Sequence, residues 1–522
     1  MDELKELGQQ LLLEAETGLL SSAPNAPANG WHDPEFELPY SRKTWSDIEF
    51  LLTRRWFRNI SVVRDYPAQT RVEYGNKNMP LHLLINAIYC LYSKKRDLSD
   101  LQKELEQAIG AVVRLPVLSY PRLLHRASTF KRCTDPRDKI YGTVSVAPRK
   151  LAASISLDYD DSNTEGNVYA SAMLAHAKIT QRFELFHNCF FAEDIMSDDP
   201  SWVPNFWSEM PGETYIPAQF AAFSSRAHFT VINREKTPPN VNPKSDILRV
   251  LGLRFAEVSR ISTPLPAWTY RWGAIRRVRE WQPDDIDRVY SPTNEPMRKA
   301  YALTLNCNIT KEREPDWMLT STTAWVDQDF GEQALFGRYS ATSSTSEIRS
   351  DVSDAVQCCG DRLFFRTNEG YIGLGPSNTQ AGDIIAVSLG CSTPLALRPS
   401  SRGPDHYTVI GECFIYGIQD GNLLLGPLPQ PWTGIAAWAA GDRRILSFLN
   451  TETQGVSAED LRLCDDDLDG WERTTKLLDG DDLINYDFFR NKETGELINY
   501  DPRLEPEKLE KKGVKLEWFS LV

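Results

Sequence analysis

The chain has 522 residues, of which 41% are hydrophobic and 25% are charged, an ordinary globular composition that allows roughly two to four packed units. Its formal net charge of −14 opposes binding to a phosphate backbone, so the sequence predicts no nucleic-acid partner. None of the nine cysteines has a CxxC spacing, and we interpret them as buried thiols in a reducing compartment.

The N-terminal region, residues 1–43, is predicted to form a short helix followed by a flexible linker. Residues 1–20 are acidic and helix-periodic, without the basic start and apolar block of a secretory signal. Residues 21–30 are rich in Pro, Ala, Asn and Gly, which is typical of a linker. The most apolar stretch, 79–92, is too short to cross a membrane. We therefore expect a cytoplasmic protein with no membrane span.

A helical region is predicted from residue 44 to residue 195. Its clearest helix is TWSDIEFLLTRRWF, for which Thr44 or Ser46 would be the N-terminal cap. Its best amphipathic helix covers residues 168–180, and a short extended piece is expected within 61–75. The following region, which we bound at 196–355, is rich in Pro, Ser, Thr and Trp and is interpreted as a mixed connecting region.

Within this connecting region, one strand is predicted at 247–258 and a helical pattern from about 279 to 305. A β module is predicted over 356–430. Two extended runs around a Gly-containing turn at 362–375 indicate a hairpin, and further runs of strand length follow.

The last region, 431–522, is mixed and acidic. The sequence therefore predicts the α+β class. It would have mainly helical N-terminal and middle regions and a small antiparallel β barrel or sandwich near 361–420.

The segment CTDPRDKIYG, residues 133–142, concentrates charge before an apolar run. Asp135 suits an N-cap, Pro136 suits the first helical position, and Asp138 could reach back as in a capping box. This helix start does not explain Arg137, Lys139 and Tyr141. As an alternative, Arg137 and the exposed N–H groups would bind an anion. The candidate site residues are Asp135, Arg137, Asp138, Lys139 and Tyr141.

Several stretches resemble fungal heterokaryon-incompatibility (HET) domain proteins, in the order that the family shows. TDPRDKIYG is similar to the family signature D-P-R-D-K-[VI]-[YF]. Residues 45–63 resemble the stretch that closes the HET domain, and 201–207 resemble S-W-x-P-D-W. Residues 362–421 resemble the family's C-terminal β module, and 494–504 resemble its frequent ending. The resemblance implies a protein of non-self recognition that acts through an unknown protein partner.

The N-terminal half of the HET domain is missing from this pattern. The S-Y-x-W-G and C-I-N-Q stretches of the family do not occur, and Ser61, Arg64 and Asp65 stand where the family has W-x-x-Q-E. HET domains resemble TIR domains, some of which cleave NAD, and that activity would need the missing half. The resemblance therefore implies an inactive or regulatory HET-like protein. The missing half would either have been lost by truncation or lie upstream of a gene model that starts too late.

No local signature of nucleophilic or zinc-dependent catalysis is present, so the sequence identifies no catalytic residue, leaves a Cys/His/Asp site from distant positions open, and predicts no cofactor and no metal. Residues 465–470 match half of a calcium loop, but Lys476 stands at the position of its bidentate Glu. As an alternative function, the chain would be an enzyme recruited to a fungal specialised-metabolite pathway. It would then bind a small molecule in a large cavity lined by aromatic residues. An exposed apolar patch would instead favour a HET-like protein that acts by binding a partner protein.

Overall fold

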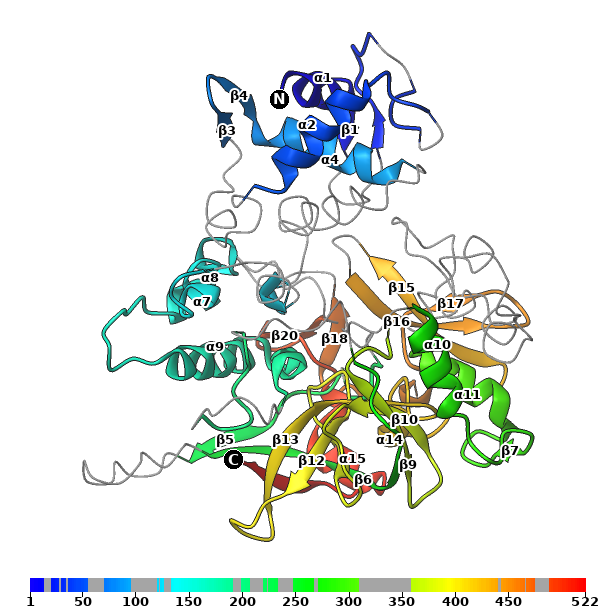
Figure 1. Ribbon diagram of the computed structural model, residues 1–522. Coiled ribbons are helices and arrows are strands. Elements are labelled where there is room, and N and C mark those ends of the chain that lie inside the picture. Colours follow the sequence, from blue (N-terminus) through cyan, green and yellow to red (C-terminus); the bar gives the residue numbers. More distant parts are fainter. Residues whose placement is uncertain are drawn as a thin grey trace. The chain divides into compact units, whose positions relative to one another are not determined.

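The structure is a computed structural model of the chain, whose helices and strands are labelled in Figure 1. The chain divides into two compact units, which are described separately. The first comprises Met1–Val168, Phe206–Glu209 and Ala439–Arg443, and the second comprises Tyr169–Asn205, Met210–Trp438 and Arg444–Val522. The structure describes residues 1–13, 20–27, 30–33, 36–54, 70–94, 120–121, 123–125, 133–190, 199–206, 219–222, 224–232, 247–266, 271–308, 358–439, 443–464, 466–474 and 488–522.

Some predicted features lie outside these described residues. They are residues 55–63 of the stretch that resembles the end of the HET domain, the connecting region from 309 to 355, and both Asp465 and Lys476 of the half calcium loop. Among the helices that are described, none is long and apolar enough to cross a bilayer.

In the first unit, three helices share an apolar core that includes Leu4, Leu84 and Ile88, each fully buried. A Cβ on Gly8 would lie 2.1 Å from the carbonyl oxygen of Leu83, so a glycine is needed for this close approach of the first and third helices. The three helices are α1 (Asp2–Gln9), α2 (Arg42–Leu52) and α4 (Leu81–Ser93).

The N-terminal helix is shorter than predicted, because the chain turns into a hairpin directly after α1. Strands β1 (Leu11–Leu13) and β2 (Leu20–Ser22) pair in antiparallel fashion, with Leu11 opposite Ser22. The apolar run of leucines that looked helical therefore supplies a strand. Residues 21 and 22, predicted as linker, belong to the second strand of this hairpin.

The predicted cap of α2 was wrong. The Ser41 hydroxyl oxygen accepts a hydrogen bond from the Thr44 backbone N–H at 3.1 Å. Ser41 has the extended backbone of an N-cap. The helix therefore begins at Arg42, before both of the predicted caps, Thr44 and Ser46.

The remaining elements of the first unit are short. The expected extended piece within 61–75 is strand β3 (Arg71–Tyr74), which pairs with β4 (Lys77–Pro80). The helix that was expected to start in the charged segment is a single turn, α7 (Asp138–Tyr141). A 3₁₀ turn and helix α8 (Arg149–Ser154) follow it. Farther along, α9 (Glu165–Thr180), which runs from the first unit into the second, confirms the helix predicted at 168–180, although its apolar residues are not confined to one face.

The second unit is built on a nine-stranded sheet, in which β6 can be followed in Figure 1. The strand at 247–258 is confirmed as part of β6, which extends to Ile261. The hairpin at 362–375 is confirmed as β9 and β10, with Phe365 opposite Gly373. The strands of this sheet are β5 (Phe229–Ile232), β6 (Ile247–Ile261), β9 (Arg362–Thr367), β10 (Ile372–Pro376), β11 (Ile384–Ser388), β12 (Leu395–Pro399), β13 (His406–Glu412), β14 (Phe414–Ile415) and β21 (Glu517–Leu521).

The α+β class is confirmed, but the strands near 361–420 do not form a small antiparallel module of their own. Both β9 and β11 pair with β6, which precedes them by about a hundred residues in the chain. Strand β13 pairs in parallel with β21 at the C-terminus, with His406 opposite Ser520. The result is a mixed sheet formed by three separate stretches of the chain, which carry β5 and β6, β9 to β14, and β21.

The helical pattern predicted from 279 to 305 is interrupted. Helix α10 (Arg271–Glu280) and helix α11 (Met297–Leu305) are separated by the two-residue strands β7 (Val289–Tyr290) and β8 (Glu295–Pro296). The Tyr290 hydroxyl anchors this hairpin to the sheet, because it donates to the Tyr416 carbonyl oxygen at 2.9 Å. A second hydrogen bond, from the Ile372 N–H at 3.2 Å, reaches the same hydroxyl.

The C-terminal region adds short strands and turns before β21 rejoins the central sheet. Strands β16 and β17 pair through Phe448 and Ser457, and β18 and β19 pair through Glu472 and Arg490. The elements here are α14 (Asn422–Leu425), β15 (Trp432–Ala439), β16 (Arg443–Asn450), β17 (Val456–Ser457), β18 (Trp471–Thr474), β19 (Phe488–Asn491), β20 (Leu497–Ile498) and α15 (Pro506–Lys511).

Candidate functional site

The charged segment at 133–142 folds around an ion pair between Asp135 and Arg137. Asp135 Oδ1 accepts from the Arg137 backbone N–H at 2.9 Å and from Nε at 3.0 Å, and Oδ2 accepts from Nη2 at 2.8 Å. These contacts fix the guanidinium in one orientation and lower the pKa of the Asp135 carboxyl. Asp135 thus caps the turn, although the regular helix begins only at Asp138.

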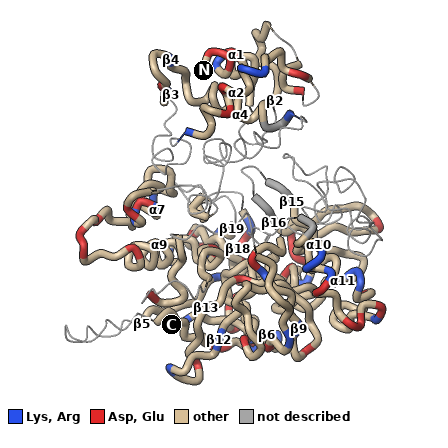
Figure 2. The backbone as a smooth tube through the Cα atoms, viewed as in Figure 1, with Lys and Arg blue, Asp and Glu red and all other residues tan. Residues whose placement is uncertain are grey.

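The other edge of the Arg137 guanidinium holds the loop between α8 and α9, which contains three aspartates (red in Figure 2). Nη1 donates to the carbonyl oxygens of Asp160 at 2.8 Å and Asn163 at 2.9 Å. The Tyr159 ring centre lies 5.3 Å from the guanidinium carbon, within the range of a cation–π contact. Arg137 therefore joins the turn at Asp135 to this loop.

Two further residues of the segment contact the same loop. The Tyr141 hydroxyl donates to the Asp158 carbonyl oxygen at 3.0 Å, and Asp138 accepts from the Tyr159 hydroxyl at 2.6 Å. Asp138 therefore bonds across to the loop, whereas a capping box would have it reach back along the helix. Lys139 is buried, with 5% of its surface exposed. The structure brings the five candidate residues together. Anion binding by this segment stays a prediction, and an anion would have to compete with these contacts for the donors of Arg137.

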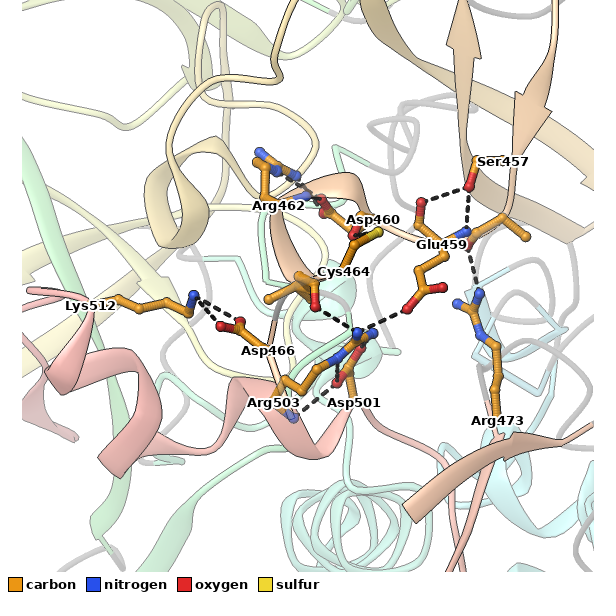
Figure 3. A network of polar contacts seen from close by, with 12 residues as sticks. Ser457, Glu459, Asp460, Arg462, Cys464, Asp466, Arg473, Asp501, Arg503 and Lys512 are labelled. Atoms are coloured by element: carbon orange, nitrogen blue, oxygen red, sulfur yellow. Dashed lines mark hydrogen bonds and ion pairs between the residues drawn. The ribbon is translucent and has the colours of Figure 1, made fainter. Parts of the chain in front are cut away.

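The Asp135–Arg137 arrangement occurs twice more, near the C-terminus (Figure 3). In Asp501–Arg503, the backbone N–H and Nε of the arginine donate to Oδ1 at 2.9 and 3.0 Å, and Nη2 donates to Oδ2 at 2.8 Å. Asp460 and Arg462 repeat the same three contacts at 3.0, 2.9 and 2.6 Å. We call each of these three pairs an Asp-x-Arg clamp.

The two C-terminal clamps bind distant turns through the remaining donors of their arginines. Arg503 Nη1 donates to the Leu463 carbonyl oxygen at 2.8 Å and to Glu459 Oε1 at 2.9 Å. Arg462 donates to the carbonyl oxygens of Gly426 and Asp420, each at 2.6 Å. The two clamps therefore tie the C-terminal segment to the turn after β17, and that turn to α14 beside the sheet.

A small pocket of about 70 Å³ lies beside these clamps, with Asp460 and Asp501 in its wall. Ligand sites for drug-sized molecules are usually about 300–1,000 Å³, so this pocket has room only for a few waters or one side chain. Its lining is mostly apolar, with Arg473 and three aspartates at the edges; it comprises Phe220, Ala221, Ala222, Ser224, Asp420, Gly421, Leu424, Leu425, Leu446, Phe448, Ala458, Asp460, Leu463, Arg473, Asp501 and Leu504.

A second group of polar side chains is buried where a turn packs against the sheet. Glu412 on β13 accepts from Arg362 Nη2 at 3.0 Å, and Arg362 Nη1 donates to the Glu412 carbonyl oxygen, also at 3.0 Å. The other oxygen of the Glu412 carboxylate contacts His187 Nδ1. Because buried charges need partners, this trio holds the turn at His187 against the two strands. In the described part of the chain, no three His, Cys, Asp or Glu side chains group as metal ligands.

Sequence reasoning missed the buried trio and the shared geometry of the clamps. His187 and Glu412 are separated by more than two hundred residues, and no local pattern connects them. The clamps did leave a signal, because D-P-R occurs at 135–137 and again at 501–503. The third clamp has Leu461 in place of proline, so only its Asp-x-Arg spacing could have pointed to it.

Comparisons with known proteins give matches over part of the chain. Residues 291–426 match the model of the Het-6 beta-barrel domain. The chain is 38% identical over 60 residues to "Heterokaryon incompatibility protein 6, OR allele" of Neurospora crassa. That alignment covers 11% of this chain and 9% of the relative, and no solved structure matches. The resemblance to fungal heterokaryon-incompatibility proteins is thus confirmed over part of the chain.

Proposed function

We propose that this chain takes part in fungal non-self recognition and acts by binding a partner protein. The observation that carries the proposal is the Het-6 beta-barrel match, together with a relative whose name refers to heterokaryon incompatibility. Both matches are partial, so the activity of the relative enters here as a proposal for this chain.

The polar contacts at the candidate sites support a binding role more than a catalytic one. In each clamp, both carboxylate oxygens and most donors of the guanidinium are used within the chain. A catalytic carboxylate or arginine would instead need free groups that face a substrate. The clamps position loops and turns, which is the support that a recognition surface requires.

An exposed aromatic pair in the first unit has the composition of a binding surface. The Arg54 guanidinium lies 4.0 Å from the Phe50 ring centre and donates to the Tyr74 hydroxyl at 3.0 Å. The side chains of Phe50 and Tyr74 are 57% and 43% exposed. Aromatic residues and arginine are enriched at protein interfaces and among their energetic hot spots. We call Phe50, Arg54 and Tyr74 the aromatic patch.

Expression of the full chain in hyphae of a filamentous fungus tests this proposal. Vital-dye uptake should rise above that of an empty-vector strain, because recognition in this class ends in cell death. The double variant Phe50→Ser, Tyr74→Ser should lower uptake at equal protein level. Val289→Ser, which changes another exposed apolar residue, is the matched control and should leave uptake unchanged. Healthy hyphae at full expression would overturn the expectation that recognition by this chain triggers cell death.

The enzyme alternative stays a prediction. It requires a large cavity lined by Trp and Tyr, whereas the pocket beside the clamps is small and has Phe220 and Phe448 as its aromatic residues. Metabolite profiles of a deletion strain would test it, because loss of a pathway enzyme removes one product and accumulates its precursor.

A further inference from the structure

Three cysteines meet where helix α11 ends and the chain approaches β9. Cys359 Sγ donates to the carbonyl oxygen of Leu305, the last residue of α11, at 3.3 Å. The thiol of Cys358 is close enough to that of Cys307 to raise the pKa of the Cys307 thiol. Cys307 and Cys359 belong to one buried apolar cluster, and Cys358 packs against it. Two residues that are about 50 positions apart in the chain therefore bring their sulfur atoms together.

The backbone holds the Cys307 thiol in place. Cys307 and Asn308 both have left-handed backbone conformations, with φ of 53° and 60°. The N–H of Cys307 donates to the Thr304 carbonyl oxygen at 3.1 Å, and that of Asn308 donates to the Leu303 carbonyl oxygen at 2.7 Å. Such a turn closes the end of a helix and fixes the direction of the side chain that follows it.

The members of this cluster differ in accessibility. Cys307 and Cys359 are 4% and 0% exposed, whereas Cys358 is only partly buried. A small oxidant can therefore reach Cys358 first. The sulfur in contact with it is Cys307, which is placed to react with an oxidised Cys358. The Cys359 sulfur is instead directed at a backbone carbonyl.

We propose that Cys307 and Cys358 form a peroxide-responsive dithiol site. In the first step, the Cys358 thiol reacts with hydrogen peroxide to give a sulfenic acid and one water. In the second step, the Cys307 thiol attacks the sulfenic sulfur, an S–S bond forms, and a second water carries away the hydroxyl and the thiol proton. The disulfide joins the end of α11 to the residues just before β9 and closes the intervening chain into a loop.

The rate of the second step should depend on pH. Burial, together with the neighbouring Cys358 and Cys359, raises the pKa of the Cys307 thiol well above its usual value, although the positive charge of Arg362 acts in the opposite direction. The thiolate is the attacking species, so the crosslink should form faster as the pH rises from 7 to 9. The site would then respond to sustained peroxide more than to a brief pulse.

Peptide mapping of the full chain tests the proposal. The reduced protein is treated with hydrogen peroxide, blocked with N-ethylmaleimide and digested with trypsin without reduction. Trypsin separates Cys307, in peptide 300–311, from Cys358, in peptide 350–362. We expect a crosslinked pair of these peptides that is two hydrogens lighter than their sum and that reduction splits.

Variants decide which sulfur atoms react. Cys358→Ser should abolish the crosslink, although Cys359 remains on the same peptide. Cys307→Ala should leave a sulfenic acid at Cys358 that dimedone traps, provided that circular dichroism shows a folded protein. Cys464→Ser removes an exposed thiol elsewhere and should leave the crosslink unchanged. A crosslink that survives in Cys358→Ser, or none at peroxide levels that oxidise Cys464, would overturn the proposal.

Discussion

At the scale of single residues, the Asp-x-Arg clamp is the repeated device of this protein. An aspartate two residues before an arginine accepts both the backbone N–H and the side chain of that arginine, as at Asp501 and Arg503. The pair orients the guanidinium before it contacts anything else, so its last donors are already directed at distant carbonyls. Sequence alone located the D-P-R segments but could not show which carbonyls they bind, because those lie elsewhere in the chain.

Replacing Arg503 by lysine should strongly destabilise the second unit. The lysine keeps the charge but loses the fork that binds Asp501, and Asp501 is only 4% exposed. A buried acceptor that is left without its hydrogen bonds costs about 1–3 kcal/mol, so we expect the free energy of unfolding in urea to fall by about that amount. Arg490→Lys is the matched control, because its pair with Glu472 is exposed and should contribute less than about 1 kcal/mol. Equal losses in the two variants would contradict a special role of the clamp.

The clamp at Asp135 should make the first unit sensitive to acid. The hydrogen bonds from Arg137 hold the pKa of the Asp135 carboxyl below its usual value of 3.8, so the folded state favours the ionised form. That stabilisation is present above the unfolded pKa and is lost as the pH falls through the lower, folded pKa. Asp135→Asn should therefore have a lower Tm than the native chain at pH 6, and the difference should shrink below pH 3.8. A difference that stays constant from pH 6 to pH 2, or that Glu493→Gln reproduces, would show that the ion pair is not its cause.

At the scale of elements, the sequence predicted the helices and strands that depend on residues close together in the chain. The β9–β10 hairpin and helix α9 follow from local periodicity and were predicted correctly. The sequence did not predict the end of α1 or the break between α10 and α11, because hairpins override the local pattern at both places. The pairing of β9 and β11 with β6 lies beyond any local signal, since the partner strands are far apart in the chain.

Gly373 in β10 should be essential for the packing of this sheet. A Cβ at this position would lie 2.4 Å from the Phe414 carbonyl oxygen and 2.6 Å from Cζ of Phe365. The backbone oxygen cannot move without breaking the β10–β14 pairing, so Gly373→Ala should lower the free energy of unfolding by about 1–3 kcal/mol. Urea denaturation followed by tryptophan fluorescence measures this loss. Gly455→Ala, at an exposed turn with one neighbouring atom at 3.3 Å, should change it by less than about 0.5 kcal/mol.

At the scale of the whole molecule, the family match and the folded unit have different boundaries. The Het-6 beta-barrel match covers residues 291–426, which contain six of the nine strands of the central sheet. Strands β5 and β6 precede the match, and β21 lies at the opposite end of the chain. The clamps at Asp460 and Asp501 also lie beyond the match, and they tie the C-terminal segment to α14 and the turn after β17.

We therefore expect the matched segment to depend on the rest of its unit for folding. A fragment of residues 291–426 would lack β6, which pairs with β9, β11 and β21, and it would expose the apolar strands β9 and β11 along open edges. Such a fragment should aggregate or show no cooperative unfolding, whereas residues 169–522 should unfold in one transition in urea. Removing residues 515–522 from the longer fragment deletes β21 and should cost most of that cooperativity. Two-state unfolding of 291–426 alone would instead show that the matched domain is independent and that β6 and β21 are later additions to its edges.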